Sequence, residues 1–275
     1  MVIDPRAIVD PAARIAADVE IGAFTIIEAD VEIGAGTRIG AFTQVCRGTR
    51  IGRENHIHMH VVLGNEPQDL SYRGAPTRLE IGDRNTIREG AHLHRGSAED
   101  SPTVVGDDCF LMTNSHVAHD CRVGNGAILA TGATLGGHAV VGPRAFLSGY
   151  CLVHQHVRVG RLAMVQGGCA VSREVPPFLI AALPTNQLAG VNAVGLRRAG
   201  LDRPAITALR RAYRALFAHR VNLGRASEAL LRAESERGGP TAEVRELLDF
   251  IAASKRGVCF GRRRSAARTA DDAED

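Results

Sequence analysis

Two histidines and a carboxylate lie within eight residues near the middle of the 275-residue chain, between Asn114 and Cys121. His116, His119 and Asp120 are the side chains of this stretch that can exchange a proton. A histidine with its ordinary pKa of about 6.5 can accept a proton from a hydroxyl group near neutral pH, and an adjacent carboxylate can orient the ring. General-base catalysis is therefore the chemistry that this stretch suggests.

A six-residue period predicts the backbone around these side chains. Every sixth residue from Ile3 to Val171 is Ile, Leu or Val at 26 of 29 positions, and the residue four places later is often small or β-branched. This pattern is the hexapeptide signature of a parallel β-helix, in which three short strands form one coil of 18 residues. Residues 18 apart should therefore lie above one another, with the anchors and small residues pointing into the core.

The period divides the chain into regions. We expect the β-helix to occupy residues 1–190, with loop excursions at 64–80 and 94–104, where the period is interrupted. Proline residues after Val175 should end the strands, and helical spacing then predicts a C-terminal helical domain over 191–260. The final residues, 261–275, are expected to be disordered. The helices predicted in the C-terminal domain begin near Asp202, Arg225 and Thr241.

Composition and charge limit the possible classes of protein. The aromatic fraction is 4% with no tryptophan, and 45% of residues are hydrophobic, which fits a globular protein built from aliphatic repeats. No basic start followed by an apolar run and no membrane-length apolar stretch occurs, so we expect a cytoplasmic protein without a membrane span. Six cysteines without a CxxC motif agree with a reducing compartment.

The basic residues are concentrated in the helical region. Residues 196–264 contain 16 Lys and Arg against 7 Asp and Glu, a net charge of +9. Such a surface is either simply solvated or a docking face for an acidic partner. Nucleic acid is a weaker candidate partner, because no aromatic stacking platform accompanies the arginines.

The position of each residue within the six-residue repeat predicts whether its side chain faces outward or into the core. Ten of the eleven histidines fall between His56 and His156, and none occupies an inward slot of the repeat, so we expect them to face outward. Four cysteines fall in the inward slot for small residues and are predicted to fill the core, not to act as nucleophiles. These four are Cys109, Cys121, Cys151 and Cys169.

Stacking by 18 residues predicts a vertical cleft. It sets Gly137 above His119 and Gln155 one coil further, with Asp120, His138 and His156 in the neighbouring column. The glycine would leave room beside the imidazole and expose a backbone N–H for a tetrahedral oxyanion. If the group attacked here is the acyl carbonyl of a thioester, the substrate already carries a good leaving group, and the reaction needs no covalent enzyme intermediate. Metal binding by His116, His119 and His138 is the alternative, although spacing alone gives no clear set of three converging ligands.

Short motifs along the chain are similar to those of one enzyme family. They are Gln68-Asp69-Leu70, Pro76-Thr77-Arg78, Ile81-Gly82-Asp83-Arg84-Asn85, His94-Arg95-Gly96, His116-Val117-Ala118-His119-Asp120-Cys121, Val153-His154-Gln155, Val175-Pro176-Pro177 and Gly190-Val191-Asn192. With these motifs, residues 1 to about 257 resemble the acyl-carrier-protein–UDP-N-acetylglucosamine O-acyltransferases, which begin lipid A biosynthesis in Gram-negative bacteria.

The resemblance implies a homotrimer of left-handed β-helices with active sites at the clefts between subunits. It implies transfer of an (R)-3-hydroxyacyl chain from acyl carrier protein to the glucosamine 3-hydroxyl of UDP-N-acetylglucosamine. No bound cofactor is implied, since the acyl group arrives on the carrier's phosphopantetheine. His119 would be the general base, Asp120 its support and Gly137 the oxyanion donor.

The resemblance also implies a set of substrate-binding residues. Asn192 and Arg198 would hold the nucleotide, and Gly167 would leave space for a long acyl chain. The remaining members would line the groove for the sugar and the acyl-phosphopantetheine; they are Gln68, Asp69, Ser71, His116, His138, His154 and Gln155.

Two positions depart from the family pattern. Ser71 stands where the family usually has a lysine, and Val194 stands where an acidic residue is usual. A related amino-sugar nucleotide, acylated on nitrogen, therefore stays open as the acceptor. An inactive trimeric scaffold that binds the carrier protein is the non-enzymatic alternative.

Overall fold

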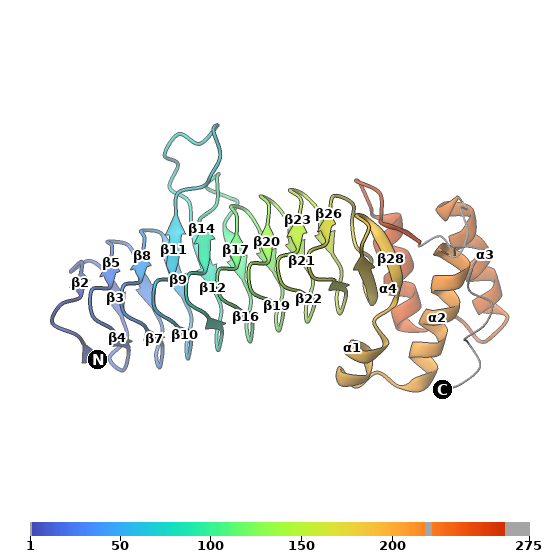
Figure 1. Cartoon of the computed structure of the whole chain (residues 1–275), viewed down its shortest axis with the longest axis horizontal. Helices are drawn as coiled ribbons and strands as arrows, with labels where there is room; N and C mark the ends of the chain where they lie inside the picture. The colour runs from blue at the N-terminus through green and yellow to red at the C-terminus, as the bar shows by residue number, and fades with distance from the viewer. Residues whose placement is uncertain (1, 218–221, 262–275) are drawn as a thin grey trace.

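The computed structural model describes residues 2–217 and 222–261, which form a three-sided parallel β-helix followed by a helical domain (Figure 1). Each coil contributes one short strand to each of three sheets, and strands of successive coils pair in parallel. Away from the excursions, paired residues are 18 apart in sequence, as in the pair Ile3 and Ile21. The 18-residue stacking predicted from the sequence is therefore confirmed.

Within the described residues, the first sheet has twelve strands and runs the full length of the β-helix into the helical domain. In spatial order its strands are β1 (Val2–Ile3), β4 (Glu20–Ile21), β7 (Arg38–Ile39), β10 (His56–Ile57), β13 (Thr86–Ile87), β16 (Phe110–Leu111), β19 (Ile128–Leu129), β22 (Phe146–Leu147), β25 (Met164–Val165), β27 (Leu179–Ala182), β28 (Gln187–Val191) and β29 (Phe260–Gly261).

The other two sheets complete each coil. The second sheet contains β2 (Ile8–Val9), β5 (Ile26–Ile27), β8 (Gln44–Val45), β11 (Val62–Asn65), β14 (His92–His94), β17 (His116–Val117), β20 (Thr134–Leu135), β23 (Leu152–Val153) and β26 (Ala170–Val171). The third contains β3 (Arg14–Ile15), β6 (Glu32–Ile33), β9 (Thr49–Ile51), β12 (Leu79–Ile81), β15 (Thr103–Val105), β18 (Arg122–Val123), β21 (Val140–Val141) and β24 (Arg158–Val159).

The core contains the residues that the period assigns to it. From Ile21 onward the anchor residues are buried, and the small slot holds buried threonine, alanine and cysteine side chains. All six cysteines are free and buried, including the four predicted to fill the core. Burial raises the pKa of the Cys121 thiol to about 12, because a thiolate would lose its hydration there. Cys121 is therefore no candidate nucleophile.

The strands do not end at the prolines that follow Val175, which corrects the sequence prediction. β27 pairs in parallel with β25 and extends the first sheet by one strand, and β28 then returns antiparallel to it. Pro176 and Pro177 lie in the turn between Val175 and β27, where a residue without an N–H costs no ladder hydrogen bond. A proline there marks a corner of the coil and not its end.

The described part of the helical domain contains four helices, α1 (Ala193–Arg198), α2 (Arg203–Phe217), α3 (Leu223–Ser235) and α4 (Ala242–Ala252). The three longer ones agree with the predicted helices, and Asp202 and Thr241 accept hydrogen bonds from the first turns of α2 and α4. α1 was not predicted, because six residues are too few for a periodic pattern.

A salt bridge and a cation–π contact attach this domain to the β-helix. Arg158 forms a bidentate pair with Glu174 and lies over the Phe250 ring of α4, while Arg161 pairs with Glu246 of the same helix. Of the predicted disordered residues, Gly261 lies in β29, and 262–275 lie outside the described residues. Among the described helices, none is long and apolar enough to cross a membrane.

Candidate active site

Two excursions leave the coil on the same side, and the larger one projects well beyond the β-helix (Figure 1). Their irregular parts are shorter than predicted, 66–78 and 95–102, because the flanking residues pair in β11, β12, β14 and β15. Arg95 of the second excursion connects the two. Its guanidinium donates to the Gly64 carbonyl, the Glu66 carboxylate and the Tyr72 hydroxyl. The second excursion thus supports the first.

His119 and Asp120 form a hydrogen-bonded pair beneath the excursions. His119 Nδ1 lies 2.6 Å from Asp120 Oδ2, and the Asp120 side chain has 0% of its surface exposed. Burial alone would raise the pKa of Asp120, but hydrogen bonds from His119 and Ser97 outweigh it and hold this pKa below its usual value. The carboxylate is therefore ionised at neutral pH and fixes Nδ1–H as the donor, and Nε2 has no hydrogen-bond partner among the residues that the structure describes.

Gly137 lies directly against the imidazole, as the stacking predicts. A Cβ atom at this position would lie 2.6 Å from both Cε1 and Nε2 of His119. In the described part of the chain, the Gly137 N–H has no hydrogen-bond acceptor, while its carbonyl accepts from the His156 N–H. A glycine here therefore provides both space for the ring and a free donor beside Nε2.

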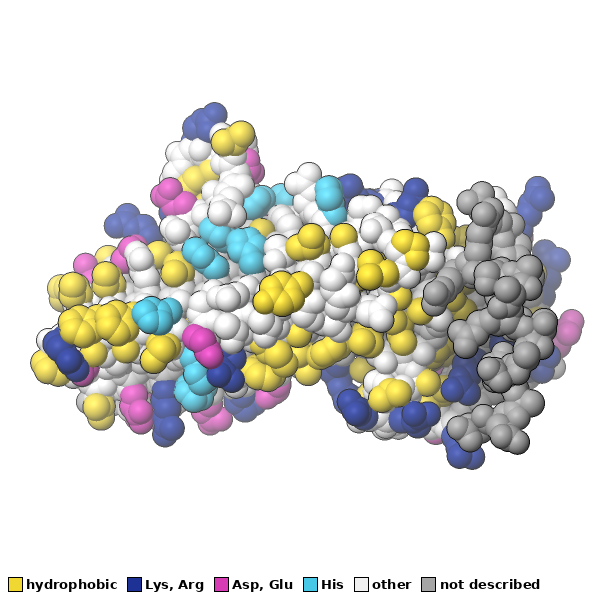
Figure 2. All heavy atoms as spheres, viewed as in Figure 1, with side chains coloured by type: hydrophobic (Ala, Val, Ile, Leu, Met, Phe, Trp, Pro, Cys, Tyr) yellow, Lys and Arg dark blue, Asp and Glu magenta, His cyan; other side chains and the backbone are white. Residues whose placement is uncertain are grey.

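A groove of about 510 Å³ opens in front of this pair. It combines polar and apolar walls, as expected for a site that holds a polar acceptor and an acyl chain. Its lining includes Gln68, His116, His119, Thr134, Gly136, Gly137, Leu152, His154, Gln155, Ser172 and Thr185. Histidine side chains gather around the base of the projecting excursion (Figure 2). The groove thus brings Gln68 together with five predicted site residues of the coil, which are His116, His119, Gly137, His154 and Gln155.

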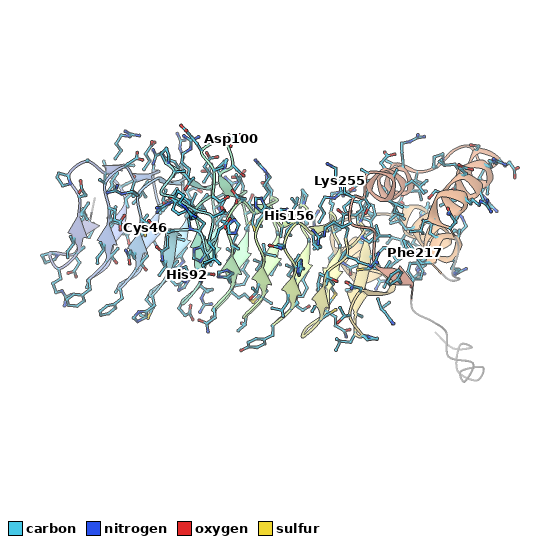
Figure 3. All side chains as sticks on the ribbon, turned by 90° about the horizontal axis from the view of Figure 1, so that it is seen from above. Cys46, His92, Asp100, His156, Phe217 and Lys255 are labelled. Carbon is cyan, nitrogen blue, oxygen red and sulfur yellow. The ribbon has the colours of Figure 1, made fainter. Side chains whose placement is uncertain are left out.

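His138 lies beside the groove in the neighbouring column. Its Nε2 atom is 3.4 Å from Asp120 Oδ2, and its ring is perpendicular to that of His119 and stacked on that of His156. Figure 3 labels His156 on the side of the β-helix that also carries Lys255 of the helical domain. The predicted column of Asp120, His138 and His156 is therefore present.

His116 belongs to a second histidine cluster, and one member of that cluster, His94, corrects the prediction that these histidines all face outward. Its neighbours are His92 and His94, with ring centroids 6.3 and 5.2 Å away. Burial, followed by the charges of His94 and His92, lowers the pKa of His116 to about 4, so its ring is neutral near pH 7. His94 is itself buried and not outward-facing, because the first excursion covers it: His94 Nδ1 lies 2.6 Å from the Glu66 carbonyl.

The residues that could bind a metal ion differ from the predicted set of His116, His119 and His138. Among the described residues, the three side chains whose ligand atoms lie within 4.8 Å of one another are His119, Asp120 and His138, without His116. Both Asp120 oxygens already accept hydrogen bonds from Ser97, and Oδ2 also lies 2.6 Å from His119 Nδ1. These contacts occupy both acceptor positions of Oδ2 and one of Oδ1, and Oδ2 is the oxygen that both histidines approach.

Comparison with known proteins assigns the family. A family model described as UDP N-acetylglucosamine O-acyltransferase, domain 2, matches residues 174–259, and a model of bacterial transferase hexapeptide repeats matches 30–65 and 102–137. The acyl-[acyl-carrier-protein]–UDP-N-acetylglucosamine O-acyltransferase of Ralstonia nicotianae is 54% identical over 263 residues, covering 93% of this chain and 97% of that protein. The chain belongs to this acyltransferase family.

Solved acyltransferases of the family have the same architecture. The structure of LpxA from Acinetobacter baumannii is 36% identical, with a TM-score of 0.88 over 94% of this chain and 99% of that chain. UDP-N-acetylglucosamine acyltransferase from Arabidopsis is 31% identical, with a TM-score of 0.76 over 94% of this chain and 100% of that chain. The predicted left-handed β-helix with a C-terminal helical region is therefore the fold of this acyltransferase.

The remaining predicted site residues of the acyltransferase lie at its edge or apart from it. Asp69 accepts hydrogen bonds from the Ser71 N–H and hydroxyl, and these bonds lower the pKa of Asp69. Gly167 lies against the Gly149 carbonyl at another corner of the coil. Asn192 uses both ends of its amide within the chain, on the Leu162 carbonyl and the Gly195 N–H, and Arg198 is exposed at the end of α1.

Sequence reasoning missed several residues of the site. Ser97 binds Asp120, Arg95 supports the first excursion, and the charge of Arg256 acts on His156 from the helical domain. The motif His94-Arg95-Gly96 was a signal for the second excursion. No pattern in the sequence places Arg256 beside His156, because the turn after α4 approaches the β-helix only through tertiary packing.

Proposed function

We propose that this chain transfers an (R)-3-hydroxyacyl group from acyl carrier protein to the glucosamine 3-hydroxyl of UDP-N-acetylglucosamine, the first step of lipid A biosynthesis, in the cytoplasm. Membership of the acyltransferase family supports this reaction. The observation that carries the chemistry is the 2.6 Å contact between His119 Nδ1 and buried Asp120, which leaves Nε2 free next to the groove.

In the proposed mechanism His119 is the general base. Nε2 accepts the proton of the sugar hydroxyl as its oxygen attacks the thioester carbonyl, and the Gly137 N–H donates to the oxyanion that forms. Collapse of the tetrahedral intermediate releases the thiolate of phosphopantetheine, which takes the proton from the His119 imidazolium. The enzyme needs no cofactor of its own in this scheme, because the acyl group arrives already activated.

His116 has a different proposed role. A ring with a pKa of about 4 is a poor proton acceptor, but it is neutral and can donate a hydrogen bond to a substrate oxygen. His154 and Gln155, on the same groove, are proposed to contact the donor arm or the sugar nucleotide.

The helical domain is proposed to bind the acidic carrier protein. Its net charge of +9 over residues 196–264 attracts an acidic partner and speeds its association. Burial, followed by the charges of His138 and Arg256, lowers the pKa of the His156 ring, so the basic surface reaches the end of the histidine column. A carrier docked there would have its arm directed toward His119.

A homotrimer is the proposed assembly. Large apolar side chains are exposed along the second sheet and the corner beside it, and yellow side chains follow this face in Figure 2. Leu70 at the tip of the first excursion is 98% exposed, which suits a loop that contacts a neighbouring subunit. The exposed side chains on this face are Ile8, Phe24, Ile26, Phe42, Tyr150 and Leu152.

The test is acyl transfer with purified enzyme. Hydroxyacyl carrier protein would be supplied with UDP-N-acetylglucosamine or its 3-amino analogue, and products would be separated by mass spectrometry. The proposal expects an ester with the natural nucleotide. A product formed only as the amide would identify an amino-sugar N-acyltransferase, and no product with either acceptor would favour a carrier-binding scaffold.

A variant pair tests the assigned base. His119→Ala should lose at least about 100-fold in turnover, and His56→Ala should keep it, because His56 lies on another sheet, stacked on His58. Light scattering should give three subunits for all of these proteins. Normal turnover by His119→Ala would refute the mechanism.

A further inference from the structure

The second excursion closes over the carboxylate that supports the base. The Ser97 N–H donates to Asp120 Oδ1 at 3.0 Å, and the Ser97 hydroxyl donates to Oδ2 at 2.7 Å. We propose that Ser97 is a positioning residue of the acyltransferase reaction, which holds the Asp120 carboxylate so that its Oδ2 receives the Nδ1–H of His119. This inference rests on the proposed function and assigns a role to a residue outside the predicted site.

Two bonds from one residue fix the plane of the carboxylate. Because Ser97 contacts both oxygens, Asp120 cannot rotate about its terminal torsion without breaking one of these bonds. The Asp120 backbone is held separately, since its N–H donates to Thr103 Oγ1 at 2.8 Å. Thr103 thus anchors the main chain and Ser97 orients the side chain.

The excursion is shaped to make this contact. A Cβ atom on Gly96 would lie 1.9 Å from the Ser101 carbonyl and 3.2 Å from Asp120 Oδ1. Only glycine therefore allows the chain to pass this close to the carboxylate. A hydrogen bond from Ser101 also contributes to the lowered pKa of Asp120. The residues just after the His94-Arg95 pair thus form a set of donors around one acidic group.

Two histidines approach the oxygen to which the Ser97 hydroxyl donates. His119 Nδ1 is 2.6 Å from Asp120 Oδ2, and His138 Nε2 is 3.4 Å from the same atom. The two distances make His119 the close partner of Oδ2. Without the Ser97 hydrogen bonds, the carboxylate is free to turn toward His138, and the base loses the bond that sets its orientation.

Removing the Ser97 hydroxyl should also change the proton affinity of the His119–Asp120 pair in a direction that can be derived. A donor to a carboxylate spreads its negative charge, so removing the donor makes the His119–Asp120 pair bind a proton more readily. The reaction needs His119 unprotonated. The acidic limb of the pH profile of kcat/KM should therefore move to higher pH in Ser97→Ala, a change that a general loss of folding stability would not produce.

The experiment compares Ser97→Ala, Ser97→Thr and the control Ser235→Ala, whose hydroxyl binds a carbonyl within α3. Each would be assayed over a range of pH, with the ¹⁵N signals of His119 recorded in parallel. We expect Ser97→Ala to lower kcat by about ten- to a hundredfold, the loss of one hydrogen bond to a charged group, with little change in KM. Ser97→Thr should restore most of the rate, and Ser235→Ala should match the wild type.

A double-mutant cycle completes the test. In an Asp120→Asn background the Ser97→Ala change should have little further effect, because its target no longer carries the charge. Wild-type kcat and an unshifted acidic limb in Ser97→Ala would overturn the role of Ser97 while leaving the proposed function intact. Absence of activity in the wild type would instead refute the proposed function, and the ¹⁵N titration would still report whether Ser97 acts on His119.

Discussion

Replacing Gly137 with alanine tests the geometry of the base directly. The added Cβ would lie 2.6 Å from two atoms of the His119 ring, whereas ordinary contacts of this kind are 3.4–4 Å. The ring must therefore move by about 1 Å, although the 2.6 Å bond to Asp120 holds its other side. Misplacement of a catalytic group by about 1 Å can cost about 100-fold in rate, equivalent to about 2.7 kcal/mol of barrier.

The substitution should leave the fold intact. Gly137 does not have a left-handed φ, so alanine adds no backbone strain, and the substitution keeps the backbone N–H. Gly149→Ala is the matched control, because a Cβ there would approach the Thr131 carbonyl at 3.4 Å, an ordinary contact. Acyl transfer and thermal unfolding would be measured for both variants.

The expected result is a loss of about 100-fold in kcat for Gly137→Ala, with a melting temperature close to that of the wild type. The double variant His119→Ala, Gly137→Ala should then be no slower than His119→Ala alone, since both changes remove the same function. Near-normal turnover by Gly137→Ala would show that the imidazole tolerates the added methyl group, and the assignment of His119 would lose its geometric support.

Three further predictions concern stability and reactivity. The pKa of Asp120 is lowered in the folded chain, so the carboxylate contributes its full stabilisation above about pH 4 and loses it as the pH falls through the folded pKa. The difference in unfolding free energy between the wild type and Asp120→Asn, measured with urea, should therefore shrink below about pH 4. Glu174→Gln should cost about 2 kcal/mol, against no measurable change for the exposed Glu228→Gln, because it breaks a bidentate pair whose carboxylate is 3% exposed. All six thiols should resist Ellman's reagent at pH 8 until the chain unfolds, and rapid labelling of the native protein would contradict their burial.

The architecture could be predicted from the sequence because the repeat makes burial periodic. A six-residue period fixes which side chains enter the core, and stacking by 18 then places Gly137 over His119 without any knowledge of long-range contacts. The same rule separated the buried thiol of Cys121 from the adjacent His119–Asp120 pair. In this respect the site is a local property of the coil.

The contacts that could not be predicted involve segments outside the repeating coil. His94 is outward in the register but buried, because a separate excursion folds over it. Ser97 reaches Asp120 from a loop without period, and Arg256 approaches His156 through the packing of the helical domain. Proline usually ends a strand, but Pro176 and Pro177 occupy a corner of the coil where no ladder hydrogen bond needs an N–H donor.

The 18-residue coil also determines how this chain can change in length during evolution. Removal of one whole coil brings each later residue onto the same face as before, so a shorter helix can keep its sheets in register. Removal of a single hexapeptide between His119 and Gly137 would instead rotate everything that follows by one of the three faces. The glycine would then lie on a different side of the prism from the imidazole, and the groove would be lost even though every core anchor remained buried.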